Sequence, residues 1–241
     1  MKTTVFACVM ATVCFLGHGE TAPVESGKSG VEADRSQEEL GNLVDGYYKS
    51  PNPAKAIALV KTAEKMLTPN TAHPTYGFYL GAVSKSLDRR DEWIAAQKSV
   101  TSACVRAAID LGLKGTTLGE VLPDEPGKLT PSHLDLIWGW FMATGDSEAA
   151  RRVIRRGGMK GDYVRKESDI DLTAMAARWS SVSLALSHPV VKRELEMFAR
   201  TASEKEIVNF FSLAPLGENE RKVLSEEAVK RIESILPATP E

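Results

Sequence analysis

Apolar residues recur every three or four positions in segment after segment of this chain, and no segment alternates apolar and polar residues over the length of a strand. A spacing of three to four places side chains along one face of an α-helix, whereas a half-buried strand needs a period of two. We therefore predict an all-α protein of about ten helices with no β-sheet. The expected helices begin near Ser36, Asn52, Pro74, Asp91, Thr130, Asp146, Asp169, Pro189, Ser203 and Glu220.

Several of these starts carry local capping signals. Ser36 with Glu39, and Ser203 with Glu206, form the S-x-x-E capping box, and Thr130-Pro131 is a second kind of start signal. We expect the helix that begins at Asp91 to run on to Leu111. Residues 114–129 hold too many glycines and prolines for a helix and predict the one long loop.

Short connections between successive helices require them to fold back as antiparallel pairs. We predict that residues 36–236 form a single helical-repeat domain, a right-handed array of stacked antiparallel helix pairs. Residues 20–35 are polar with little to bury, which predicts a disordered linker. Residues 237–241, after the stop at Pro237, are expected to form a disordered tail.

The N-terminus has the layout of a secretory signal peptide. Lys2 precedes an apolar run at residues 3–16, and the small residues Gly17 and Gly19 suit the positions before a cleavage site. The run is too short for a stable membrane span. We predict cleavage after Gly19 and a periplasmic or secreted protein; an uncleaved N-terminal anchor is the alternative. Cleavage would leave Cys104 as the one cysteine, which we expect to be a small buried apolar residue.

Two helix pairs share a pattern of spacing. Large apolar residues line the first helix of each pair and an alanine stands where the second helix crosses it, and the corresponding positions are Leu40, Leu43, Tyr47, Ala56 and Val60 in one pair and Leu134, Ile137, Phe141, Ala150 and Ile154 in the other. With the turn at Gly145-Asp146, this pattern resembles the tetratricopeptide repeat, which implies a stacked helical array with a concave binding surface. The strings at residues 134–146 and 176–180, with His188-Pro189, are also similar to a group of uncharacterised exported bacterial proteins, and that similarity implies no activity.

The overall charge limits the class of partner. The chain is 43% hydrophobic and 26% charged, with a formal net charge of −2. This is the composition of an ordinary globular protein. Such a balance gives no general attraction for nucleic acid or an anionic membrane.

A cluster of basic residues is the strongest local charge feature, and it comprises Arg151, Arg152, Arg155, Arg156, Lys160, Arg165 and Lys166. One interpretation is a docking patch for an acidic partner, a phosphate or an anionic headgroup. The other is a solvated helix face with cations at its C-terminal end. Trp138 and Phe141 share an apolar stripe and are expected in the core, whereas Trp140 falls off it and is a candidate binding residue.

No pattern points to catalysis, a metal or a cofactor. His73, His133 and His188 are scattered, whereas zinc sites need clustered ligands. Acidic residues are plentiful, but sequence spacing does not show the facing pair of carboxylates that a glycosidase needs.

These observations favour a non-enzymatic interaction module or scaffold of the bacterial cell envelope. A protein or peptide partner would lie in the concave groove, bound by Trp140, Arg152, Arg155 and Arg156 in one exposed concavity. A small envelope hydrolase that acts on cell-wall or glycan substrate through paired carboxylates is the alternative. A third hypothesis is a homo-oligomer in which an aromatic face is the subunit interface.

Overall fold

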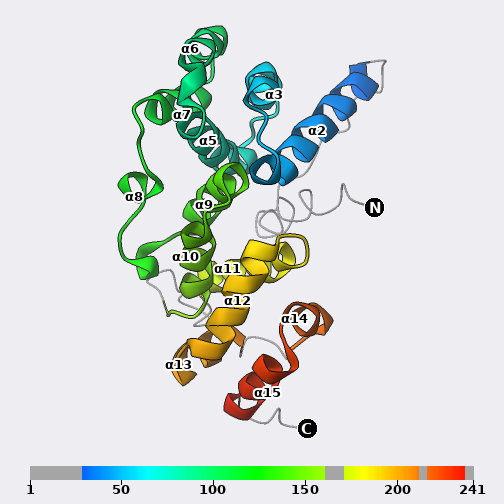
Figure 1. The fold of residues 1–241 in the computed structure, drawn as a ribbon, viewed down its shortest axis with the longest axis vertical. Helices are drawn as coiled ribbons and strands as arrows, with labels where there is room; N and C mark the ends of the chain where they lie inside the picture. The colour runs from blue at the N-terminus through cyan, green and yellow to red at the C-terminus, as the bar shows by residue number, and fades with distance from the viewer. Residues whose placement is uncertain (1–28, 161–170, 212–215, 237–241) are drawn as a thin grey trace. The chain divides into compact units, whose positions relative to one another are not determined.

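The computed structural model describes residues 29–160, 171–211 and 216–236. These ranges hold fourteen α-helices and three short 3-10 helices and no β-strand (Figure 1). The all-α prediction is therefore confirmed for the described residues. The predicted signal peptide at residues 1–19, the linker up to residue 28 and the tail at 237–241 lie outside these ranges.

The described chain divides into two compact units. Unit 1 comprises the described residues up to Glu120 together with Trp138–Gly145, and unit 2 comprises Val121–Ile137 and the described residues from Asp146 onward.

The helices of unit 1 are α2 (Ser29–Gly46), η1 (Tyr47–Lys49), α3 (Pro53–Ala58), α4 (Val60–Lys65), α5 (Pro69–Ser84), η2 (Leu87–Arg89), α6 (Arg90–Ser99) and α7 (Ala103–Leu113). Those of unit 2 are η3 (Pro126–Lys128), α10 (Ser147–Gly157), α11 (Leu172–Ala185), α12 (Pro189–Thr201), α13 (Glu204–Phe211), α14 (Glu218–Val223) and α15 (Glu226–Ile235). Two helices, α8 (Leu118–Val121) and α9 (Pro131–Thr144), have residues in both units.

Helix α5 is the centre of unit 1. It packs against α7, where Gly112 lies directly against Val83. It also approaches the end of α9 so closely that a methyl group on Gly139 would lie 2.1 Å from the carbonyl oxygen of Pro74. Glycine is required at such a contact because a side chain would push the two backbones apart.

Aromatic rings fill the interior beside α5. Tyr47, Phe78, Tyr79 and Trp93 form a chain of edge-to-face contacts with ring centroids 5.2–6.2 Å apart. This geometry is favourable because the positive edge of one ring meets the negative face of the next. The Trp93 Nε1 donates to the Ser86 hydroxyl at 2.9 Å, which in turn donates to the carbonyl of Ala82.

In unit 2, the helices α10, α11 and α12 pack against one another, α13 and α14 pack against α11, and α15 packs against α12. The buried side chains of α10 show why it takes this position. Ala149, Ala150, Val153 and Ile154 form one apolar stripe, and small alanines allow close approach of the neighbouring helices.

Several predicted helix starts are confirmed. The Asn52 side chain accepts a hydrogen bond from the Lys55 amide at 2.9 Å and caps α3. Ser203 and Glu206 form the reciprocal capping box before α13, with the Ser203 amide donating to the Glu206 carboxylate at 2.8 Å. Gly145 has φ = 66°, the left-handed conformation that suits glycine at the end of α9.

Two predicted starts are wrong. Pro74 lies inside α5, which begins at Pro69 and is capped by Thr68 and Thr71. Pro74 is the sixth residue of the helix and has no amide to donate to the carbonyl four residues earlier, so α5 lacks one backbone hydrogen bond at this position. Helix α2 begins at Ser29, so Ser36 does not start it and residues 29–35 are helical rather than part of a linker.

The number of helices exceeds the prediction because three expected helices are broken. The segment from Asn52 splits at Leu59, the segment from Asp91 at Val100–Ser102, and the last helix at Leu224–Ser225. Ser102 and Ser225 each accept an amide hydrogen bond that caps the next helix. The long loop at 114–129 also contains the short helix α8 and the 3-10 turn η3.

Candidate functional site

Helix α10 carries four of the basic residues predicted as a docking patch. Asp146 caps the helix by accepting from the Glu148 amide at 2.9 Å. With 3.6 residues per turn, the arginines at 151 and 155 share one side of the helix and those at 152 and 156 share another. The two pairs therefore have different surroundings. Arg165 and Lys166 lie outside the described residues.

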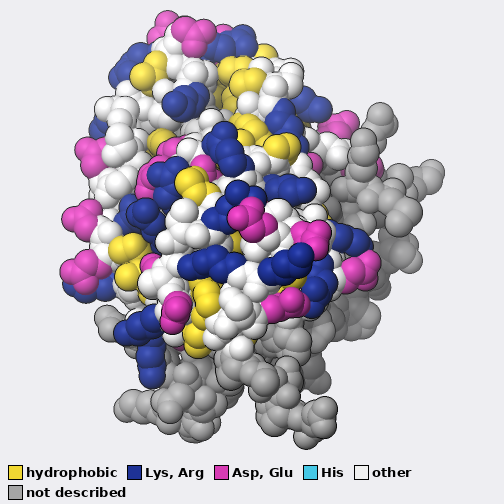
Figure 2. Space-filling view, turned by 60° about the horizontal axis from the view of Figure 1, so that its bottom comes forward, with side chains coloured by type: hydrophobic (Ala, Val, Ile, Leu, Met, Phe, Trp, Pro, Cys, Tyr) yellow, Lys and Arg dark blue, Asp and Glu magenta, His cyan; other side chains and the backbone are white. Residues whose placement is uncertain are grey.

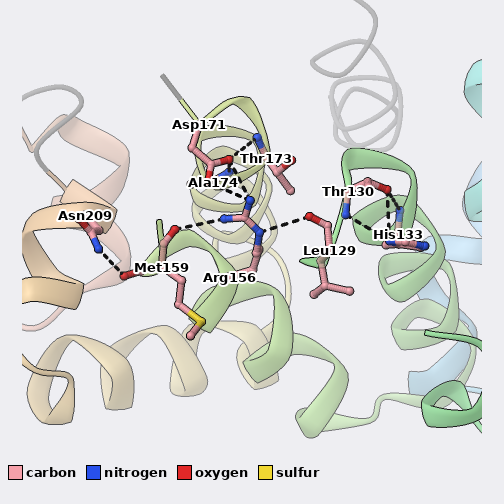
Figure 3. A network of polar contacts seen from close by, with 10 residues as sticks. Leu129, Thr130, His133, Arg156, Met159, Asp171, Thr173, Ala174 and Asn209 are labelled. Carbon is pink, nitrogen blue, oxygen red and sulfur yellow. Dashed lines mark hydrogen bonds and ion pairs between the residues drawn. The ribbon is translucent and has the colours of Figure 1, made fainter. Parts of the chain in front are cut away.

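Arg156 is the centre of a buried polar network (Figure 3). Its side chain has no exposed surface, and its Nη2 donates to both carboxylate oxygens of Asp171 at 2.9 Å. The same guanidinium donates to the carbonyls of Leu129 at 3.3 Å and Met159 at 3.1 Å. It thus joins the loop before α9, the end of α10 and the start of α11.

Asp171 also caps helix α11. Its carboxylate accepts from the amides of Thr173 and Ala174, both at 3.0 Å, and caps α11. A buried charge is stable only when it is paired and hydrogen-bonded, and both conditions hold here. The expected cap at Asp169 lies outside the described residues, and Asp171 is the residue that caps α11.

Two of the four predicted binding residues therefore do not face solvent. Arg156 is committed to Asp171, and Trp140 is only 7% exposed. Trp140 lies beside Gly81 of α5, so α9 is buried on that side as well as along the stripe of Trp138 and Phe141. The expectation of one exposed concavity formed by Trp140 and the arginines is wrong. Trp140 also belongs to unit 1, whereas α10 belongs to unit 2.

Arg152 is half-buried and holds the loop in place. Its Nη2 donates to the carbonyl of Pro123. Arg155 is exposed, and none of the ion pairs within 4.0 Å among the described residues includes it. Of the four predicted binding residues, Arg155 is the one whose side chain is exposed.

A neighbouring helix adds basic residues beside Arg155. Arg151 pairs with Glu194 of α12 at 3.0 Å, and Arg193 reaches the same carboxylate at 3.4 Å. The hydrogen bond that Arg151 donates to Glu194, whose side chain is 2% exposed, is the main reason why the pKa of Arg151 is raised. The two arginines therefore flank one buried acid from opposite helices.

The direction of the helices brings Arg155 to this cluster. Arg151 meets Glu194, and Gly158, two turns later on α10, lies against the ring of Phe198. Both helices therefore advance in the same direction, and Arg155 falls at the level of Met197, which is 40% exposed. We call this surface the basic face, and it comprises Arg151, Arg155, Lys192 and Arg193 around Met197.

Figure 2 shows one face of the molecule on which Lys and Arg side chains are numerous, with acidic and smaller apolar areas between them. The charge of Arg155 also affects the neighbouring carboxylate of Glu206. The pKa of Glu206 is lowered, first by the hydrogen bonds from Ser203 and to a lesser degree by the charge of Arg155.

One tryptophan of the described residues is strongly exposed, and it is Trp179 on α11 at 45%. The sequence makes Trp179 one of four aromatic candidates for a binding groove, together with Trp138, Trp140 and Phe141, but Trp140 is the one predicted to bind a partner. A usable signal was present, since Trp179 stands in a run of sixteen residues, 172–187, in which Arg178 is the one charged residue.

The three predicted histidines do not form a cluster. His73 is exposed, His133 accepts from the amide of Thr130 at 3.1 Å, and His188 is buried before α12. In the described ranges, no group of three or more His, Cys, Asp or Glu side chains is arranged to hold a metal ion. Cys104 is half-buried, and burial raises the pKa of its thiol.

One carboxyl group has a strongly shifted pKa. Burial raises the pKa of Asp135 on α9 to about 7. Among the residues that the structure describes, no second acidic side chain contributes to this shift, whereas a pair of catalytic carboxylates would raise one pKa by mutual repulsion. The shifted pKa of Asp135 therefore does not support the pair of catalytic carboxylates that the hydrolase hypothesis requires.

Comparison of the chain with protein-family models, with curated proteins and with solved structures found no match. None of the helices in the described part of the chain combines the length and the apolar character needed to cross a bilayer.

Proposed function

We propose that this chain is an exported, non-enzymatic interaction module that binds an acidic segment of another protein on the basic face. The observation that carries the proposal is the exposure of Arg155, which has no ion-pair partner within 4.0 Å among the described residues. An exposed guanidinium can donate two parallel hydrogen bonds to a carboxylate of a partner.

The neighbours of Arg155 favour an acidic ligand that also has an apolar side chain. Arg151 and Arg193 are held in place by Glu194, so their side chains lose little freedom on binding. Lys192, which precedes Arg193 in the chain, adds a further exposed cation. Met197 is flexible and polarizable, and such residues adapt to different apolar partners.

An acidic protein segment fits this surface better than a nucleic acid. Sequence-tolerant binding of single strands uses aromatic side chains on which bases stack. Met197 is the large apolar side chain of the basic face, and no aromatic residue belongs to it. The net charge of −2 also provides no long-range attraction for a polyanion.

The proposal includes the arrangement and the location of the protein. The turn at Gly145-Asp146 and the alanine at position 150 support a tetratricopeptide-like stack of helix pairs. The apolar run at residues 3–16 followed by Gly17 and Gly19 supports export. Expression of the full chain in a bacterial host tests the second point: the exported product should begin at Glu20, and a product that retains Lys2 in the cytoplasm would contradict it.

The binding function is tested with a labelled peptide of alternating glutamate and leucine residues, followed by fluorescence anisotropy. We expect binding that weakens as ionic strength rises, because exposed charge pairs are screened by salt. The double variant Arg155→Glu/Arg193→Glu should weaken binding about tenfold or more, since like charges then oppose the peptide.

The matched control is Lys98→Glu/Arg106→Glu, which reverses two exposed charges on α6 and α7 and leaves the basic face intact. It should bind the peptide as the unmodified protein does. Arg152 is not suitable for this test because its replacement would release the loop at Pro123. Equal binding by all three proteins would reject the proposal, and tighter binding of single-stranded DNA at the same face would reject the assignment to a protein segment.

A further inference from the structure

We draw no further inference here: the strongest candidate, the surface patch on the uncharged side of α11 where Trp179 and Leu186 are exposed, carries nothing further because nothing in the described part of the chain shows what covers it.

Discussion

Breaking the buried pair between Arg156 and Asp171 should destabilise unit 2 more than any change at an exposed ion pair. Arg156→Met removes the two hydrogen bonds to Asp171 and the hydrogen bonds to the carbonyls of Leu129 and Met159. The carboxylate of Asp171 then stays buried without the arginine that neutralises its charge. Removing one member of a buried pair costs about 3–5 kcal/mol.

The reverse change separates the charge from the cap. Asp171→Asn keeps an oxygen that can cap α11, because asparagine is also a favourable capping residue. It leaves the Arg156 guanidinium buried without an anion, and it should cost a similar 3–5 kcal/mol, roughly. In the double variant neither charge remains. The combined loss should therefore fall short of the sum of the single losses by about 2–3 kcal/mol.

The measurement is hydrogen–deuterium exchange of the backbone amides in α10 and α11, together with urea unfolding. The control is Arg221→Met, which breaks a 2.7 Å pair with Glu233 in which both side chains are about half exposed. An exposed pair contributes about 0–1 kcal/mol. If Arg156→Met costs no more than the control, or if the single losses simply add, the network around Arg156 does not hold unit 2 together.

Three further predictions concern single positions. Because the pKa of Asp135 is about 7 in the folded chain and near its ordinary value when unfolded, stability should fall as pH rises from about 4 to 7, and Asp135→Asn should remove about 2–4 kcal/mol of this dependence in urea titrations across that range. Gly139→Ala should lower the free energy of unfolding by about 3 kcal/mol or more and reduce the melting temperature, since its methyl group would collide with the carbonyl of Pro74. Glu206→Gln should cost about 0.5–1.5 kcal/mol at neutral pH through the capping box with Ser203. Since the pKa of Glu206 is lowered on folding, its contribution is lost as pH falls, and the two proteins should become equally stable in acid.

Opposite outcomes would contradict each argument. An unchanged pH dependence in Asp135→Asn would mean that this carboxyl is not the titrating group. A stable Gly139→Ala would mean that α5 and α9 separate at little cost. A constant difference between Glu206→Gln and the unmodified protein at all pH values would show that the charge of Glu206 is unimportant.

The sequence by itself determined the helical class and many of the helix starts. The three-to-four spacing of apolar residues is a local property, and capping at Asn52 and Ser203 depends on atoms within three residues. The burial of Trp138 and Phe141 followed from their shared stripe. These features need no knowledge of distant parts of the chain.

The tertiary structure alone decided which polar and aromatic residues face solvent. Arg156 is buried because Asp171, fifteen residues away, meets it at the start of another helix. Trp140 is buried because α9 lies against Gly81 of α5. Trp179 is exposed because the helices that pack against α11 cover the other sides of that helix and leave the side of Trp179 open. A helical period identifies the sides of a helix, but only the packing of its neighbours determines how many of those sides are covered.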